Sequence, residues 1–279
     1  MRANRLLAAT VLSVLGATGL TACGSDSSDN KSAAAPAAST ATSTSASAST
    51  SASAAGTGSG METLTAEEIL KKTRAAGEKL TSVKTTFKTK DADGSVSGSV
   101  IADSSGNCSG TFTIEGAGKV EIVGVGAKKW IKPDAAYLKF LVPEGNTAMA
   151  QAMAGKWLTG EGAGISDSEG FGWICEMGMQ MQRKAGLLGN GWPDSSATKT
   201  GTQQVDGAEA VLLKVKDVAS GNPVDAAVAV TGEPYLLSVA GDGSDGSGDM
   251  RFSDFGKPVT ATAPVAAQVF DMDTMLSAG

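Results

Sequence analysis

The stretch GKVEIVGVGAKKWIK, residues 118–132, contains two predicted strands, 118–125 and 128–132, joined by a short Gly-containing turn. Apolar and polar residues alternate along it, which is the pattern of strands with one buried face. Further runs of this kind lie on both sides at intervals of about eight to twelve residues, separated by turns rich in Gly and Asp. This spacing predicts an antiparallel meander.

The predicted strands form two groups with helices before and between them. The first group comprises residues 83–90, 96–102, 108–115, 118–125, 128–132 and 136–141, and the second comprises 200–205, 210–215, 225–230, 235–240, 250–255 and 259–263. A helix that ends near residue 81 comes first, because Thr65 and Glu68 form a capping box and Leu64 and Ile69 a hydrophobic staple. A short helix from Asn146 or Thr147 and a helix over about 167–184 separate the groups. This order indicates an α+β fold.

The N-terminus has the three parts of a secretory signal. Arg2 and Arg5 precede an apolar run at residues 6–20, which is too short for a comfortable membrane span. Leu20, Thr21, Ala22 and Cys23 then match the lipobox of bacterial lipoproteins. That resemblance implies removal of residues 1–22 as a signal peptide and a diacylglyceryl anchor on Cys23. Two acyl chains suffice for stable anchoring.

Residues 24–60 consist almost entirely of Ser, Ala, Thr and Gly, so they cannot repay the entropy of ordering. We therefore expect residues 23–60 to form a lipidated, disordered tether, with a root-mean-square span of about 33 Å. Residues 61–279 are long enough for one sizeable domain. The anchor would hold this domain at the extracytoplasmic face of the cell membrane.

The charge of the chain argues against nucleic acid as a partner. The sequence has 23 basic and 29 acidic residues, and loss of Arg2 and Arg5 leaves 21 basic ones. Phosphate backbones select basic surfaces, and anionic membranes do so as well. We therefore expect contact with the membrane only through the lipid anchor, and the sequence leaves a protein partner open.

Cys108 and Cys175 remain once Cys23 is assigned to the anchor. An even number of cysteines in an oxidising compartment predicts a Cys108–Cys175 disulfide, which would contribute about 4 kcal/mol in the chain-entropy model. Two buried free thiols are the alternative. The chain contains no histidine, which excludes Ser-His-Asp and Cys-His catalysis and His-ligated zinc.

Several short phrases resemble the LppX/LprAFG family of actinobacterial lipoproteins, which have a LolA-like fold. They follow one another in order behind the lipobox, as Lys119–Val123 with Trp130–Lys132, Gly155–Trp157, Val205–Gly207, Gly232–Tyr235 and Phe252–Gly256. The resemblance implies a curved antiparallel sheet, a half-barrel, with helices on its concave side. It also implies an apolar cavity, in which family members are known or proposed to hold acylated lipids or glycolipids. The long segment 160–193, which carries Cys175, departs from the family pattern.

Ten apolar residues are candidates for the lining of such a cavity. Strand alternation and the Met- and aromatic-rich middle of the chain suggest Phe112, Ile114, Val120, Ile122, Trp130, Met149, Met153, Trp157, Phe171 and Trp173. Ordinary core packing between helices and sheet is the alternative for each of them.

The sequence offers little to catalysis. Ser196–Lys199, Lys199–Gly201 and Ser28–Asn30 match the three motifs of penicillin-binding proteins, but Lys199 cannot serve two of them at once. The carboxylates near Asp242 and Asp249 do not have the spacing of an EF-hand. We therefore expect a non-enzymatic binder of an acyl lipid or glycolipid, with no metal and no cofactor. The alternative is a surface interaction or sensor domain whose core is filled by its own side chains.

Overall fold

The fold is seen in a computed structural model, which describes residues 60–92, 94–160, 165, 171–184, 197–216, 222–243 and 246–276. The chain divides into residues 1–53 and a second unit, 54–279, to which all of these belong. The expected signal peptide, the lipobox residues Leu20, Thr21, Ala22 and Cys23, and nearly all of the tether lie outside the described residues.

The described strands form one open sheet, in the order β12-β6-β5-β4-β3-β2-β1-β11-β10-β9-β8-β7. Every pair is antiparallel except β12 with β6. The strands are β1 (Ser82–Asp91), β2 (Gly94–Asp103), β3 (Cys108–Ile114), β4 (Gly118–Val125), β5 (Lys128–Pro133), β6 (Trp157–Thr159), β7 (Ala197–Val205), β8 (Ala208–Lys216), β9 (Pro223–Ala229), β10 (Leu236–Gly243), β11 (Gly246–Ser253) and β12 (Val269–Asp271). The α+β fold with a curved antiparallel sheet, predicted from the sequence, is confirmed.

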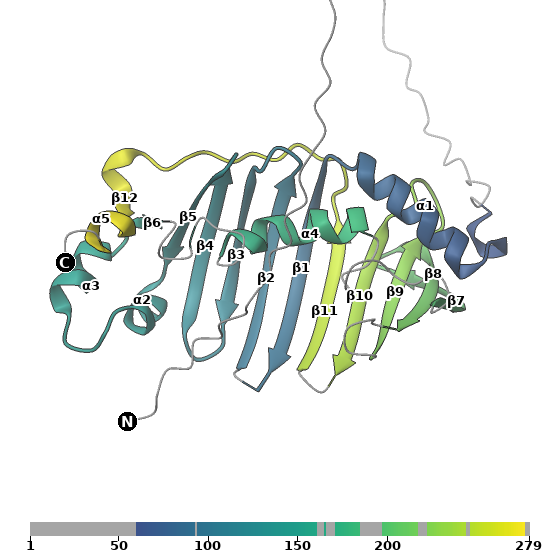
Figure 1. Ribbon diagram of the computed structural model, residues 1–279, viewed down its shortest axis with the longest axis horizontal. Helices are drawn as coiled ribbons and strands as arrows, with labels where there is room; N and C mark the ends of the chain where they lie inside the picture. The colour runs from purple at the N-terminus through teal and green to yellow at the C-terminus, as the bar shows by residue number, and fades with distance from the viewer. Residues whose placement is uncertain are drawn as a thin grey trace, which may run out of the picture. The chain divides into compact units, whose positions relative to one another are not determined.

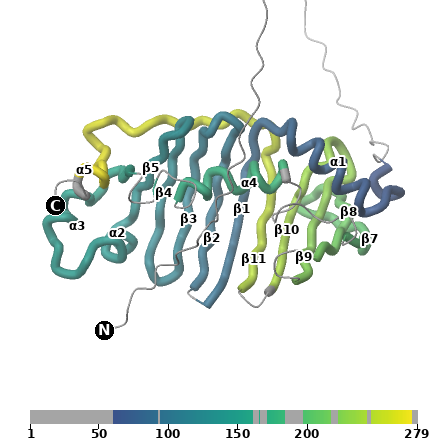
Figure 2. The backbone as a smooth tube through the Cα atoms, in the orientation of Figure 1, coloured from purple at the N-terminus to yellow at the C-terminus, as the bar shows by residue number. Residues whose placement is uncertain are grey.

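The two predicted groups of strands meet at β1 and β11, which are far apart in the sequence. Their seven paired positions run from Lys84, opposite Ser253, to Lys90, opposite Ser247. Figure 2 shows the two meanders side by side at this junction, with β2–β5 beyond β1 and β10–β7 beyond β11. One continuous sheet therefore carries both groups.

Helix α1 (Ala66–Lys79) begins as the sequence predicts. The hydroxyl of Thr65 accepts a hydrogen bond from the N–H of Glu68, and the Glu68 carboxylate accepts one from the N–H of Thr65 at 2.9 Å. These bonds hold the pKa of Glu68 below its ordinary value. Leu64 packs against the main core, and Ile69 is fully buried there.

Helix α4 (Gly172–Lys184) lies across the sheet and contacts β1, β2 and α1 (Figure 1). It approaches the strands closely, because a Cβ at Gly178 would lie 1.9 Å from Oγ1 of Thr85. It approaches α1 as closely, because a Cβ at Gly77 would lie 2.0 Å from the carbonyl oxygen of Gln182. The face of the sheet beneath α1 and α4 is called the inner face below.

The other helices are α2 (Ala135–Leu141), α3 (Thr147–Met153), α5 (Met272–Leu276) and the short 3-10 helices η1 (Met61–Thr63) and η2 (Ala266–Gln268). The strand predicted at 136–141 is wrong, since these residues form α2. Asp134 is the N-cap of that helix, with its carboxylate accepting from the N–H of Tyr137 at 2.7 Å. A cap of this kind satisfies free amides of the first turn and favours the helix.

The strand predicted at 259–263 is also wrong, because these residues form no strand. Pro258 and Pro264 flank the segment, and proline cannot donate to a ladder. The short strands β6 and β12, at one end of the sheet, and helix α5 were not predicted, since segments of three to five residues carry no periodic signal.

Candidate functional site

One cross-strand row of residues crosses most of the inner face. Directly opposed residues of antiparallel strands point to the same face. The register joins such residues from β5 to β8 as Pro133, Val120, Phe112, Gly98, Phe87, Met250, Val239, Ala226 and Leu213. We call this set the inner row. It contains no charged residue and spans about 38 Å at the usual spacing between strands.

The protein itself buries the inner row. Phe112, Val120 and Leu213 are at most 1% exposed, and Met250 is half-buried. The adjacent row on the same face contains Ile122, opposite Ile131 on β5. Of the residues that we expected in an apolar lining, Phe112, Val120 and Ile122 lie here, and Ile114 follows Phe112 by two positions on β3.

A chain of aromatic rings leads from the surface to the inner row. Phe140 on α2 is 69% exposed, and its ring lies 5.8 Å from that of Tyr137. Tyr137 contacts Phe171 edge-on at 6.2 Å, and Phe171 stacks on Phe112 at 5.6 Å. The sequence predicts Phe171 and Phe112 in an apolar lining but not Tyr137 and Phe140, because it predicts a strand at 136–141, where the structure has α2.

Tyr137, in the middle of the aromatic chain, is deeply buried. Its side chain is 3% exposed, and desolvation raises the pKa of the phenol to about 12. Asp134, which caps α2, accepts hydrogen bonds from the N–H groups of Tyr137 and Lys119, and these hold the pKa of its carboxyl below the ordinary value. The cap therefore ties α2, with Tyr137 and Phe140, to the start of β4.

Several methionines belong to the core that contains the inner row. Met153 on α3 is 1% exposed, and Met149, one turn earlier, packs partly buried against the same core. Met177, Met179 and Met181 of α4 are all buried in that core as well. Methionine side chains adapt to irregular and changing shapes. Met149 and Met153 therefore belong to the same apolar core as the inner row.

Three tryptophans that we expected in the lining lie elsewhere. Trp130 is opposite Val123, one position away from the Ile131–Ile122 pair, so it points to the outer face of the sheet. Trp157 precedes the inward Leu158 on β6 and lies beneath the ammonium of Lys132, 5.8 Å away. Trp173 is 43% exposed on α4. A shift of one residue along a strand moves every side chain to the opposite face of the sheet. The alternation within one strand does not determine how that strand is aligned with the next one across a turn.

Cys108 and Cys175 form a disulfide, the pairing expected from the sequence, which joins β3 to α4. Gly124 is opposite both Cys108 and Lys129 in the sheet. A Cβ at Gly124 would lie 2.7 Å from Sγ of Cys108 and 2.6 Å from Cδ of Lys129. The glycine therefore makes room for both side chains on the inner face.

Lys129 is an unpredicted buried charge, only 4% exposed. Its ammonium donates to the carbonyl oxygens of Gly106 at 3.3 Å and Gly126 at 2.5 Å. Burial lowers the pKa of Lys129, and the charge of Glu176 opposes that shift. The sequence does contain a sign of this burial. Lys129 precedes Ile131 by two positions, so both side chains point to the same face of the strand.

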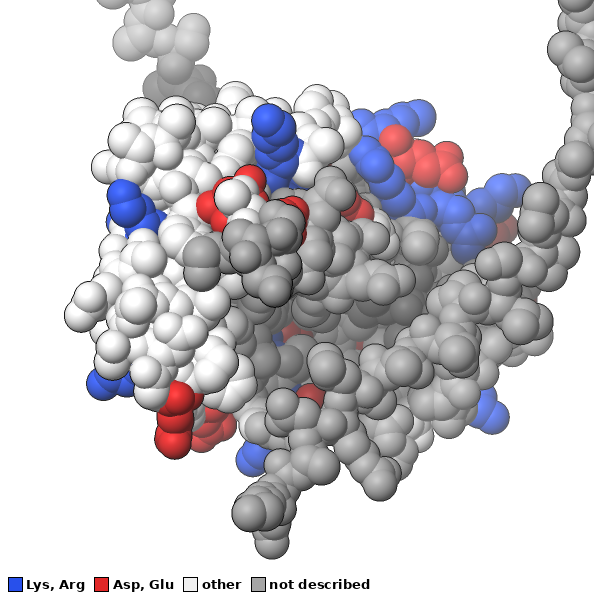
Figure 3. Space-filling view, turned by 60° about the vertical axis from the view of Figure 1, so that its left-hand side comes forward, with Lys and Arg blue, Asp and Glu red and all other residues white. Residues whose placement is uncertain are grey.

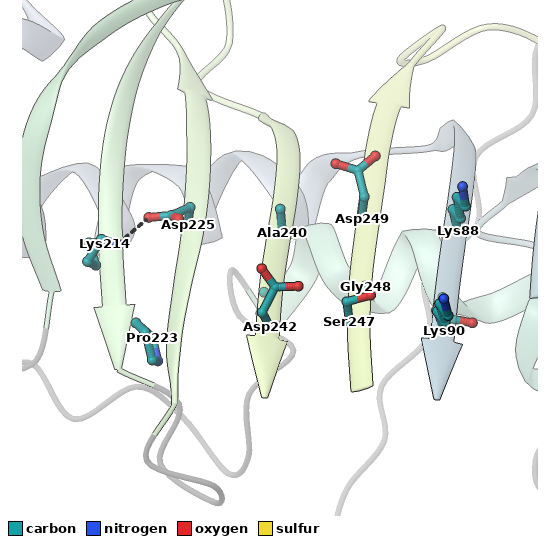
Figure 4. Close-up of a pocket in the computed structure, with 12 residues that line it drawn as sticks. Lys88, Lys90, Lys214, Pro223, Asp225, Ala240, Asp242, Ser247, Gly248 and Asp249 are labelled. Carbon is teal, nitrogen blue, oxygen red and sulfur yellow. Dashed lines mark ion pairs between the residues drawn. The ribbon is translucent and has the colours of Figure 1, made fainter. Parts of the chain in front are cut away.

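The outer face carries a different kind of pocket, of about 520 Å³, across β1, β11, β10, β9 and β8 (Figure 4). Its rim holds Lys88, Asp249 and Asp242, and Lys214 forms an ion pair with Asp225 at 3.2 Å. Its lining contains both positive and negative side chains, which do not suit an acyl chain, whose burial requires apolar walls.

Within the described residues, no group of three or more His, Cys, Asp or Glu side chains could hold a metal ion. No helix among them is both long and apolar enough to span a membrane. The face shown in Figure 3 carries Lys and Arg interspersed with Asp and Glu, rather than one basic field.

No protein-family model and no curated protein matches the chain. Among solved structures, it is similar to LprF from Mycobacterium bovis, with 16% identity and a TM-score of 0.46, over 71% of this chain and 96% of LprF. It is also similar to the lipoprotein LppX from Mycobacterium tuberculosis, with 16% identity and a TM-score of 0.45, over 70% of this chain and 97% of LppX. The solved structures that this fold resembles thus include lipoproteins of the LppX/LprF type.

Proposed function

We propose that this protein binds an acylated lipid or glycolipid on the inner face of its sheet, for carriage or presentation in the cell envelope, without a chemical step. The inner row carries the proposal. From β5 to β8 it presents eight apolar side chains, with Gly98 between them on β2, and no charge, beneath two helices. An acyl chain gains roughly 0.8 kcal/mol for each methylene that it buries on such a surface.

The side chains around the inner row suit a ligand of variable shape. The strands β8–β10 contribute the aliphatic residues Leu213, Ala226 and Val239, whereas the helices contribute methionines that can change conformation. The aromatic chain from Phe140 to Phe112 provides an apolar path to the row from the surface. An acyl chain that follows this path would stay out of water along its length.

The proposal includes the location of the protein. Residues 1–22 would be removed as a signal peptide, and lipid on Cys23 would anchor the chain to the outer side of the cell membrane. Residues 24–60 would let the domain move within a few tens of ångströms of that surface. A lipid ligand would therefore be close by.

One observation favours a second function, that of a surface interaction or sensor domain. The residues of the inner row are buried by the protein itself, with Phe112 only 1% exposed. A row that is permanently filled would stabilise the sheet and leave recognition to the outer surface. The two functions differ in whether the inner face admits an acyl chain.

Native mass spectrometry of the chain from residue 24 onward, incubated with diacyl phospholipid vesicles and separated from them, distinguishes the two. We expect a lipid-bound mass in the wild type. Ala226→Leu, which adds volume to the inner face, should reduce the bound fraction, while Ala227→Leu should not. The two alanines are equally buried at 2% exposure, but belong to clusters on opposite faces. A wild type that remains free of lipid would favour the second function.

A further inference from the structure

We propose that Sγ of Cys175 is a site of thiol–disulfide exchange, where a dithiol of another molecule opens the bond to Cys108. The bond links α4 to β3, so its reduction would free one end of a helix that covers the inner face. The inference rests on the surroundings of the disulfide and does not depend on the proposed lipid ligand.

The two sulfurs differ in access. Cys108 is fully buried on the inner face. Cys175 is 4% exposed and lines a pocket of about 240 Å³ between α4 and the β2–β3 turn. Met179, Gln180 and Arg183 line the pocket from α4, and Ser104 and Gly106 line it from the turn. An incoming thiolate therefore reaches Cys175, with Cys108 as the leaving group.

Lys129 is placed to favour that leaving group. A Cβ at Gly124 would lie 3.1 Å from Cε of Lys129, the carbon that carries the ammonium, and 2.7 Å from Sγ of Cys108. The lysine side chain and the sulfur are therefore neighbours. Two backbone carbonyl oxygens hold the ammonium there. A neighbouring cation stabilises a thiolate, and a thiol that ionises more readily leaves faster in exchange.

The reaction balances with a dithiol as reductant. The incoming thiolate attacks Sγ of Cys175 and forms a mixed disulfide, while the electron pair of the broken S–S bond stays on Cys108. The second thiol of the incoming molecule loses its proton and attacks its own sulfur in the mixed disulfide, which releases Cys175 as a thiolate. The two protons lost by the dithiol return to Cys108 and Cys175, and the dithiol ends as a disulfide.

The two ends of α4 would respond differently. Near its C-terminus, the side chain of Gln182 makes two hydrogen bonds with the backbone of Leu236, and these do not involve the disulfide. Near its N-terminus, Cys175 provides the covalent link to the sheet, one turn after Phe171. Reduction would therefore loosen the N-terminal half of α4, which the disulfide links to β3, while the C-terminal end stays attached.

A trapping experiment on the full chain in detergent needs no substitution. Glutathione, a single thiol, is added under native conditions, remaining thiols are alkylated, and peptides are identified by mass spectrometry, which separates Cys23 from the other two cysteines. We expect glutathione on Cys175 and the alkyl group on Cys108. Glutathione mainly on Cys108, or no exchange before the protein unfolds, would overturn the proposal.

The role of Lys129 is tested by the rate of reduction with dithiothreitol. Lys129→Met keeps the length of the side chain and removes its charge, and it should slow reduction at least about tenfold. Lys128→Met, at the exposed neighbouring position, should react like the wild type, and Lys129→Arg should retain most of the rate. In concentrated urea all four chains should react alike. Equal native rates for Lys129→Met and wild type would contradict the assigned role.

Discussion

The side-chain amide of Gln182 pairs with the backbone of Leu236 in both directions. Its Nε2 donates to the carbonyl oxygen at 2.8 Å, and its Oε1 accepts from the N–H at 3.1 Å. Gln182 is fully buried, and Leu236 lies at a register shift between β9 and β10. At this irregularity, a side chain 54 residues away in the sequence therefore bonds both backbone groups of Leu236.

Replacement of Gln182 by methionine should destabilise the protein by about 2–4 kcal/mol, because two buried backbone groups lose their partners. Chemical denaturation measures this loss. Gln180→Met is the matched control, since Gln180 is exposed on the same helix and its side chain donates to Glu176. A loss equal to that of the control would mean that water or another group replaces the amide.

Gly77→Ala should also destabilise, against the usual preference of helices. Alanine is normally better than glycine inside a helix by about 1 kcal/mol. At Gly77, however, a Cβ would lie 2.0 Å from the oxygen and 2.4 Å from the carbon of the Gln182 carbonyl group. We expect a net loss of about 2 kcal/mol as α1 and α4 separate. Ala75→Gly, on the exposed side of α1, measures the difference in helix propensity between the two residues alone. If Gly77→Ala were more stable than the wild type, α1 and α4 would not approach each other as closely as described.

Local sequence patterns predicted most of the strands and the start of α1, because alternation and capping depend on neighbours in the chain. The segment around residues 118–132 forms β4 and β5 almost as expected. The pairing of β1 with β11 has no local signal, since it joins residues such as Phe87 and Met250 that only the folded sheet brings together. The inner row therefore could not be read from the sequence.

The candidate site was predicted only in part, because local patterns do not give the alignment of strands across turns. Phe112, Val120 and Ile122 share a face because two-residue alternation continues across one hairpin. Trp130 does not join them, since its face depends on the register set by the next turn. Lys129 was overlooked because a lysine in a strand normally faces water, and its carbonyl partners come from turns that local patterns do not place.

Tyr137 should make stability fall at high pH. Its folded pKa of about 12 lies above the ordinary value of 10.0, so the folded state keeps the phenol proton that the unfolded state loses between those values. Stability from this group is complete below pH 10.0 and decreases as the pH rises toward 12, by up to about 1.4 kcal/mol per pH unit.

The sequence contains two tyrosines, so Tyr235→Phe leaves Tyr137 as the only one. Tyrosinate absorbance of this folded variant should then show a midpoint near 12. A midpoint near 10.0 would show that the aromatic chain from Phe140 to Phe112 admits water at its centre.

Asp134 should have the opposite dependence, at acid pH. The N–H groups of Tyr137 and Lys119 donate to its carboxylate at 2.7 and 2.9 Å, and they hold its pKa below the ordinary 3.8. The stability that this group contributes is present above that ordinary value and is lost as the pH falls through the lower folded value. Asp134→Ala should therefore be less stable than the wild type near neutral pH, and the difference should shrink on acidification.

Denaturation curves of the two proteins at a series of pH values measure that difference. Glu121→Gln, at an exposed position on β4, removes one carboxylate from that strand without removing a helix cap. Its stability should differ little from that of the wild type at every pH. If the gap between Asp134→Ala and wild type were constant across the acid range, the carboxylate charge would not be what ties α2 to β4. The attachment of Tyr137 and Phe140 would then rest on apolar contacts alone.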